Sequence, residues 1–285
     1  MFGTRYALTG CLLFAAQLLP SATAQEITEK LIKVGGLKVN VGQAGSAQPV
    51  VVFIAGLGED LSTWHNVQPQ IAQFAGTFSY DRAGLGKSDP SPEGKSVERM
   101  TSELHALLAA AGIPRPCVLV GHSLGGAIAE LFAFTYPEEV AGLVLVDPED
   151  GRLLDRLQAR ILPDQWQARQ KMLDQMMSQA SPAQKAEIQE SRASGGALAK
   201  ATPLPKVPTV LLTGTLKDPS FPGNPLEQDL KLELQNELLA TMPNAKHVLV
   251  PNSRHYIQED APNLVIEAVR SVVTDAHAHA SRGKS

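Results

Sequence analysis

The chain has 285 residues, 44% of them hydrophobic and 19% charged, which is the composition of an ordinary globular protein and argues against a disordered or fibrous one. Its formal net charge of −4 argues against nucleic acid or an anionic membrane as a partner. The length fits one large domain with an insertion as well as it fits two domains.

The first 24 residues have the pattern of a signal peptide. Arg5 precedes an apolar run at residues 7–19, and Ala22-Thr23-Ala24 forms an A-x-A cleavage site. The run is too short to span a bilayer, so we expect export to the periplasm or medium without a stable membrane anchor. Cys11 lies in a lipobox-like sequence but precedes most of the apolar run, which disfavours lipidation. After cleavage, Cys117 is the single cysteine and an intrachain disulfide is impossible.

Short apolar runs alternate with helical patterns along the rest of the chain, which predicts an α/β fold with a mostly parallel sheet covered by helices on both faces. The expected strands are at residues 31–34, 37–41, 50–54, 77–80, 117–120, 142–146, 207–212 and 246–250. The expected helices of this core are at residues 97–111, 127–136, 230–238 and 265–273. We therefore place the sheet domain at residues 25–147 and 206–274, followed by a flexible polar tail at 275–285.

Residues 148–205 differ from the rest because they are polar, rich in Gln and Ala, and contain no strand candidate. Two helical apolar faces lie at 153–161 and 166–177, and Ser181-Pro182 predicts the start of a third helix. The segment is predicted to be a helical lid. Its larger apolar side chains form either a substrate pocket or a packing face, and packing is the favoured interpretation. These side chains are Trp166, Met172, Met176 and Met177.

Residues 121–125 read Gly-His-Ser-Leu-Gly and match the G-x-S-x-G nucleophile elbow of serine hydrolases. They lie between the strand at 117–120 and the helix at 127–136, which is the strand–turn–helix context that this motif requires. The sharp turn demands small neighbours and exposes a serine at the carboxyl edge of the sheet. Ser123 is therefore the predicted nucleophile.

A serine hydroxyl needs a base that removes its proton, and His255 is the candidate. It follows the strand at 246–250 and so lies at the same edge of the sheet as Ser123. His65, beside Trp64, is the rival; we expect both to line the substrate site. His122 precedes the nucleophile and is expected to point away from it.

The histidine in turn needs a carboxylate that fixes its tautomer. Asp218 follows the strand at 207–212 through a flexible Thr-Gly exit and gives the chain order Ser, Asp, His. Asp147 and Glu149 follow the preceding strand and remain alternatives. Because Pro148 stiffens the turn after Asp147, a structural role suits Asp147 better, and Asp218 is the predicted acid.

The developing oxyanion needs backbone donors that are already in place. One is expected to be the amide of Leu124, directly after the nucleophile. The other should come from the glycine-containing loop at residues 55–58, where we choose the amide of Leu57.

Together with the Asp-Arg-Ala-Gly-Leu-Gly-Lys-Ser sequence at 81–88, these motifs make the chain resemble an α/β-hydrolase-fold serine hydrolase of the compact, lidded esterase type. One departure is Ala55-Gly56 in the oxyanion loop, where the family usually has His-Gly. Relatives that open epoxides or release halides carry aspartate at the elbow, and this chain has Ser123.

The resemblance implies a carboxylic-ester hydrolase that acts on a small molecule through an acyl-enzyme, with no cofactor and no metal. A perhydrolase, a cofactor-free haloperoxidase, a lyase or a carbon–carbon bond hydrolase would use the same residues. A ligand-binding protein of the same fold is a further alternative, which the intact set of catalytic residues disfavours. The oligomeric state is left open.

Overall fold

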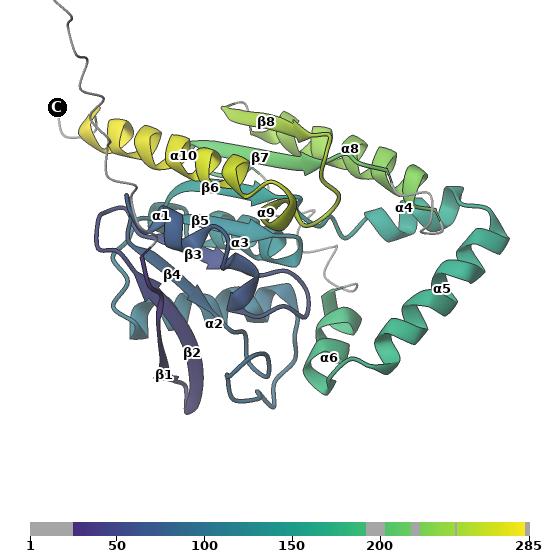
Figure 1. Ribbon diagram of the computed structural model, residues 1–285, viewed down its shortest axis with the longest axis horizontal. Helices are drawn as coiled ribbons and strands as arrows, with labels where there is room; N and C mark the ends of the chain where they lie inside the picture. Colours follow the sequence, from purple (N-terminus) through teal and green to yellow (C-terminus); the bar gives the residue numbers. More distant parts are fainter. Residues whose placement is uncertain (1–24, 192–202, 218–222, 243, 283–285) are drawn as a thin grey trace, which may run out of the picture.

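The core of the molecule is an eight-stranded sheet, whose strands are spread across Figure 1 from β1 and β2 at the lower left to β8 at the top. The computed structural model describes residues 25–191, 203–217, 223–242 and 244–282, so the predicted signal peptide lies outside it and export stays a prediction. The strands are β1 (Thr28–Val34), β2 (Leu37–Ala44), β3 (Val51–Ile54), β4 (Thr77–Tyr80), β5 (Cys117–His122), β6 (Val140–Val146), β7 (Thr209–Gly214) and β8 (Ala245–Val250). Their order is β1-β2-β4-β3-β5-β6-β7-β8. The β1–β2 hairpin and the β2–β4 pair are antiparallel, and the other pairs are parallel.

Helices cover both faces of the sheet, as the continuous apolar strands predict. In β3, Val52 and Ile54 pack with α2 and α3, whereas Val51 and Phe53 face a second core with α1 and α10. The core helices are α1 (Gln68–Ile71), α2 (Val97–Ala110), α3 (Leu124–Thr135), α8 (Asn224–Thr241), α9 (Ile257–Asp260) and α10 (Pro262–Arg282), with 3-10 turns η1 (Leu61–Trp64) and η2 (Pro137–Glu139). Among the described helices, none is both long and apolar enough to cross a bilayer.

Within the described part of the connection between β6 and β7, three helices project beyond the carboxyl ends of the parallel strands (Figure 1). They are α4 (Leu153–Arg160), α5 (Pro163–Ser178) and α6 (Pro182–Ser191). We call this segment the lid. Leu157 of α4 and Ile161, which directly follows α4, pack on Leu230 of α8 in a small apolar cluster, which attaches one end of the lid to the sheet domain.

The structure has helix where the sequence suggests a flexible tail from residue 275, because α10 continues to Arg282. Alanine is the best helix former, and three alanines lie between 276 and 280. The Nε2 atom of His277 lies 2.7 Å from the carbonyl oxygen of Gln48.

Candidate active site

Ser123 occupies a strained turn between β5 and α3. Its φ of 51° and ψ of −118° lie outside the regions that residues with a side chain usually adopt. The turn is closely packed, since a Cβ atom on Gly121 would collide with the carbonyl of Gly125. Backbone strain of this kind is typical of functional sites. The glycines of the motif therefore permit the elbow that the sequence predicts.

His255 lies in the loop after β8 and contacts a buried carboxylate. Its Nδ1 atom is 2.7 Å from Oδ2 of Asp147, which follows β6 directly and is fully buried. With Nδ1 held by Asp147, Nε2 is the nitrogen left for a proton from Ser123. Among the described residues Ser123 and His255 form no hydrogen bond with each other, and such bonds are often long in unliganded enzymes.

The carboxylate that contacts His255 is thus Asp147, the alternative to the expected Asp218. Asp218 itself lies outside the described residues. The stiff turn at Pro148 does not keep Asp147 from the histidine, because the backbone of Asp147 has a φ of 46°. Ser123 and Asp147 are the two non-glycine residues with positive φ in the described chain. This backbone conformation is not visible in the sequence.

Two further donors bind the Asp147 carboxylate. Lys231 of α8 places its Nζ atom 2.7 Å from Oδ2, and the amide of Gly214 donates to Oδ1 at 3.1 Å. Burial opposes ionisation of Asp147, but the Lys231 charge and the His255 hydrogen bond outweigh it and hold the pKa of Asp147 below its ordinary value. No motif in the sequence marks Lys231, which stands between two leucines of a helix.

The two expected oxyanion donors are both unoccupied. Within the described structure, neither the Leu57 amide nor the Leu124 amide has a hydrogen-bond acceptor. The Leu124 amide lies in the first turn of α3, where the helix dipole favours negative charge. The neighbouring Gly56 amide is already used, because it donates to Oε2 of Glu59 at 2.8 Å.

His122 connects the expected oxyanion loop to His255, the expected base. Its buried ring has Nδ1 3.2 Å from Oε2 of Glu59 and Nε2 3.0 Å from the carbonyl oxygen of His255. Burial opposes ionisation of Glu59, but the bonds from His122 and the Gly56 amide lower its pKa overall. The expectation that His122 merely points away from the nucleophile missed this contact, which braces a loop that lacks the family's usual histidine.

The residues expected to bind substrate have other surroundings. Trp64 is fully buried against Phe53, with ring centroids 5.1 Å apart, so it belongs to the core. His65 is exposed, and its Nδ1 atom lies 2.7 Å from the carbonyl of Ser62. Trp166 packs on the α4–α8 cluster, in line with the packing interpretation. Met176 lies in α5, but its side chain is outside the described part.

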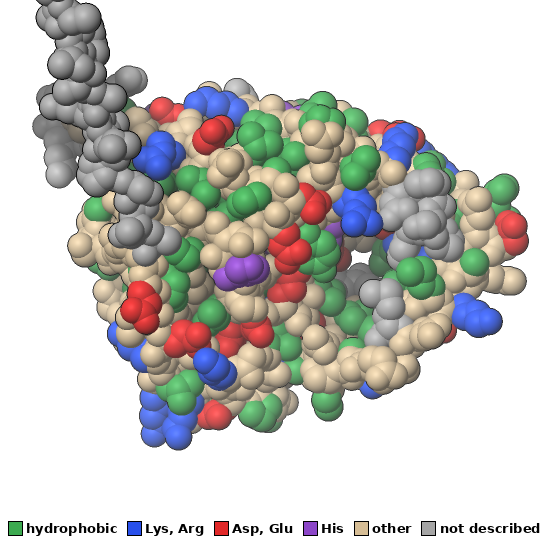
Figure 2. Space-filling view, in the orientation of Figure 1, with side chains coloured by type: hydrophobic (Ala, Val, Ile, Leu, Met, Phe, Trp, Pro, Cys, Tyr) green, Lys and Arg blue, Asp and Glu red, His purple; other side chains and the backbone are tan. Residues whose placement is uncertain are grey.

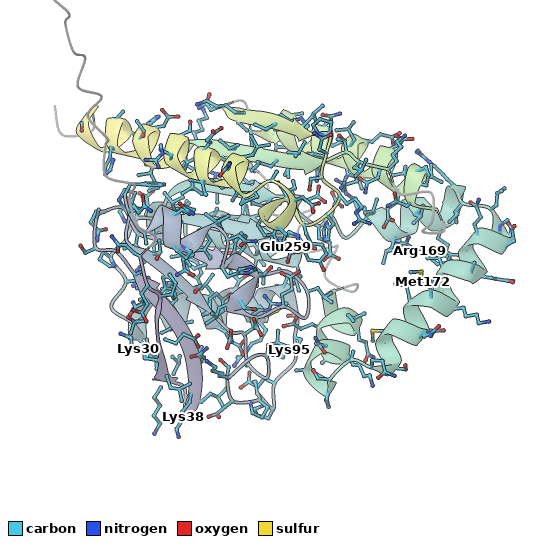
Figure 3. The ribbon with its side chains drawn as sticks, in the orientation of Figure 1. Lys30, Lys38, Lys95, Arg169, Met172 and Glu259 are labelled. Carbon is cyan, nitrogen blue, oxygen red and sulfur yellow. The ribbon has the colours of Figure 1, made fainter. Side chains whose placement is uncertain are left out.

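The surface is open between the lid and the sheet domain (Figure 2). Figure 3 shows Arg169 and Met172 on the side of α5 that faces this opening. Arg169 is bound to Glu227 of α8, with its two terminal nitrogens 3.0 and 2.6 Å from the carboxylate oxygens. The side chain of Met172 is 39% exposed.

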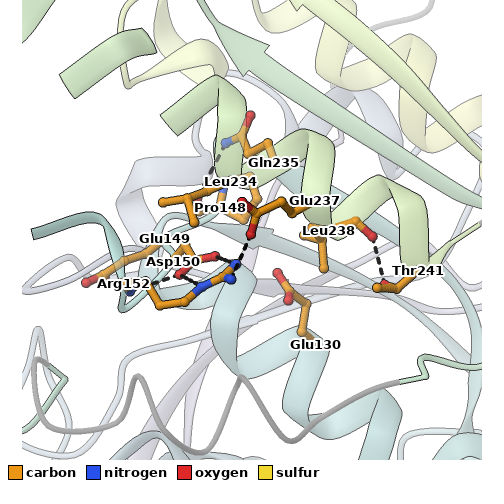
Figure 4. Close-up of a pocket in the computed structure, with 10 residues that line it drawn as sticks. All are labelled: Glu130, Pro148, Glu149, Asp150, Arg152, Leu234, Gln235, Glu237, Leu238 and Thr241. Carbon is orange, nitrogen blue, oxygen red and sulfur yellow. Dashed lines mark hydrogen bonds and ion pairs between the residues drawn. The ribbon is translucent and has the colours of Figure 1, made fainter. Parts of the chain in front are cut away.

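A separate cavity of about 290 Å³ lies behind the elbow, between α3, α8 and the segment after β6 (Figure 4). Glu130 points into it from α3, and among the described residues its Oε1 atom has no hydrogen-bond partner. Burial, and then the charge of Asp150, raise the pKa of Glu130 to about 8, while Arg152 opposes the shift. No group of three or more His, Cys, Asp or Glu side chains in the described ranges is arranged to hold a metal ion.

Comparison with known proteins identifies one family. The model of the alpha/beta hydrolase family matches residues 51–268. The uncharacterized protein YqjL of Bacillus subtilis is 38% identical over 107 residues, covering 38% of this chain and 42% of the relative. RutD of Cronobacter turicensis, named as a provisional carbamate hydrolase, is 39% identical over 100 residues, covering 35% and 37%. The matches thus span less than half of these curated relatives.

Solved structures show the same fold at low sequence identity. An esterase from Thermogutta terrifontis superposes with a TM-score of 0.63 at 18% identity, covering 88% of this chain and 99% of the esterase. The epoxide hydrolase CorEH superposes with a TM-score of 0.66 at 19% identity, covering 87% and 98%. Since these two proteins catalyse different reactions, the likeness establishes the fold and leaves the reaction to the site residues.

Proposed function

The chain belongs to the alpha/beta hydrolase family, and we propose that it is a serine hydrolase that cleaves carboxylic esters of small molecules. The observation that carries the proposal is the 2.7 Å contact between His255 and the buried Asp147, at the strand edge where the elbow presents Ser123. A nucleophile, an oriented base and two unoccupied amides are the parts that acyl transfer requires.

In the proposed mechanism Ser123 Oγ attacks the ester carbonyl while His255 Nε2 accepts its proton. Asp147 keeps the other proton on Nδ1 and stabilises the imidazolium. The Leu57 and Leu124 amides bind the oxyanion of the tetrahedral intermediate. His255 then protonates the leaving alcohol, and a water molecule activated by the same histidine hydrolyses the acyl-enzyme.

An ester is the favoured substrate because an alcohol leaves readily with one proton from His255. Amides, lactones and carbamates would use the same groups. An epoxide is disfavoured, since the elbow carries Ser123 where epoxide-opening relatives have aspartate. A panel of p-nitrophenyl esters of graded length, run beside an amide, a lactone and a carbamate, would rank these substrates by kcat/KM.

A fluorophosphonate probe tests the nucleophile. We expect the wild type to be labelled and Ser123→Ala to be unlabelled, because the probe forms a bond to an activated serine. Ser102→Ala, which removes an exposed hydroxyl on α2, is the matched control and should label like the wild type. Equal labelling of Ser123→Ala would show that another residue is the nucleophile.

Export is a further part of the proposal, motivated by residues 1–24. We expect the labelled protein from the periplasm or medium to have the intact mass of a chain that begins at Gln25 and carries one probe molecule. A mass that includes Met1 would refute cleavage, and a diacylglyceryl adduct on Cys11 would indicate a lipoprotein.

A further inference from the structure

The lid inserts a buried carboxylate into the sheet domain beside the oxyanion loop. Glu187 of α6 is fully buried, although it belongs to a short helix whose neighbouring residues Lys185 and Gln189 are exposed. Its Oε1 atom is 2.8 Å from Nε of Arg82, and its Oε2 atom is 2.8 Å from Nη2 of the same guanidinium. Burying both charges of an ion pair costs desolvation free energy, which the hydrogen bonds around the pair must offset.

The same pair holds the loop that carries an oxyanion donor. Arg82 donates to the carbonyl oxygens of Ala55 and Gly56, both at 2.6 Å. Glu187 Oε2 accepts the amide of Gly58 at 2.9 Å, and Gln184 of α6 donates to the carbonyl of Gly58 at 2.9 Å. The backbone on each side of Leu57 is therefore bound, while the Leu57 amide is left without an acceptor in the described structure.

We propose that Glu187 is a positioning residue, and that docking of α6 through Glu187 and Arg82 fixes the 55–58 loop with the Leu57 amide aimed at the oxyanion. The lid is then part of the catalytic apparatus as well as a cover. This inference rests on the proposed function for its consequence in catalysis, whereas the anchoring of the loop follows from the contacts alone.

Three variants test it. Glu187→Gln keeps the shape of the side chain but removes the charge that faces Arg82. Gln184→Ala removes the bond to the Gly58 carbonyl and also the acceptor of the Ser181 amide at the start of α6. It leaves the Glu187–Arg82 pair in place and is the milder change if Glu187→Gln folds poorly. Lys185→Gln removes an exposed charge from the same helix and serves as the control. Circular dichroism and thermal unfolding establish which variants are folded.

Kinetics separate positioning from substrate selection. Removing an oxyanion donor costs about 10²–10³ in kcat, so displacing one should cost about 10- to 100-fold in Glu187→Gln and less in Gln184→Ala, with KM nearly unchanged. The loss should be equal for p-nitrophenyl acetate and for longer esters. A folded Glu187→Gln with wild-type kcat, or with a loss confined to long esters, would overturn the proposal.

Hydrogen exchange provides a readout that needs no turnover. We expect faster amide exchange in a peptide that covers residues 55–58 in Glu187→Gln, and wild-type exchange in Lys185→Gln. Unchanged exchange in a folded Glu187→Gln would refute the anchoring itself. A wild type that hydrolyses no ester, combined with faster loop exchange in Glu187→Gln, would refute the proposed function and leave the anchoring supported.

Discussion

Among single residues, Asp147 has the most crowded environment. Its Oδ2 atom lies 2.7 Å both from Nδ1 of His255 and from Nζ of Lys231, and its Oδ1 atom accepts the Gly214 amide. A buried carboxylate is tolerated when donors satisfy it in this way. The charge of Lys231 also helps to hold the pKa of Asp147 below its ordinary value, and in the proposed mechanism the ionised carboxylate stabilises the imidazolium on His255.

Replacing Asp147 by Asn should nearly abolish turnover, because an amide keeps the shape but no longer selects the tautomer of His255. We expect kcat to fall by at least about 10² in Asp147→Asn, towards the ~10⁴ known for the equivalent change in a serine protease. Asp218→Asn should lose far less. The kcat of both variants is measured with p-nitrophenyl acetate. A larger loss in Asp218→Asn than in Asp147→Asn would show that Asp218 is the acid.

A double variant separates chemistry from stability. Asp147→Asn leaves Lys231 buried without its partner, which alone costs roughly 3–5 kcal/mol. Asp147→Asn combined with Lys231→Met also removes the buried, unpaired charge of Lys231. The double variant should regain thermal stability while its kcat stays low. Recovery of kcat in the double variant would mean that the single change acts through folding and that Asp147 is not the acid.

Among the elements, the described part of the lid contacts the sheet domain through attachments of different character. The α4 end is held by apolar packing on α8, reinforced by Arg156 of α4 and Glu237 of α8, whose side chains lie 2.8 Å apart. The α6 end is held by the buried Glu187–Arg82 pair described above. The first contact supports stability, whereas the second lies beside the oxyanion loop.

Trp166→Ala tests the assignment of the α4–α8 cluster to packing. Because Trp166 is partly buried against this cluster, its loss should lower the free energy of unfolding by about 1–3 kcal/mol. Esters of all lengths should keep their relative rates. Met172→Ala, a change at an exposed position of the same helix, is the control for stability. A change in chain-length preference without loss of stability would instead place Trp166 in the substrate pocket.

For the whole molecule, the sequence predicts the architecture better than the ends of its elements. Strands covered on both faces are mostly apolar, so β3 and β6 stand out as unbroken apolar runs. β5 and β7 contain shorter apolar runs that are followed by Gly-His and Thr-Gly. The last helix is longer than predicted. Its final residues are mainly Ala and His, which do not continue the apolar periodicity from which the helix was predicted.

Two residues of the proposed site are indicated by local sequence. Gly121 and Gly125, two positions before and after Ser123, indicate the elbow, and the strand before His255 indicates its place at the same edge of the sheet. The acid is different, because Asp147 and Asp218 both follow neighbouring strands and the choice depends on a positive φ at Asp147. Glu59, Lys231 and Glu187 act across long sequence separations, and none of them stands in a motif.

Glu130 gives the whole molecule a pH-dependent stability. Its pKa of about 8 in the folded protein compares with an ordinary value of 4.5, because burial and the charge of Asp150 disfavour ionisation and Arg152 offsets only part of this. Between these values the unfolded chain releases a proton that the folded chain retains. Stability of the wild type therefore falls as pH rises from about 5 to about 8 through this group.

Glu130→Gln removes this titration and keeps the size of the side chain. The free energy of unfolding of the variant minus that of the wild type should increase by about 2–4 kcal/mol as the pH rises from 5 to 8. Each unit of pKa shift is worth about 1.4 kcal/mol. Urea unfolding at pH 5.0, 6.5 and 8.0 measures the difference. Glu138→Gln, at an exposed position of η2, is the matched control and should follow the wild type. Parallel curves for Glu130→Gln and the wild type would show that the carboxyl is ionised in the folded protein, and that the cavity in Figure 4 admits enough water to solvate it.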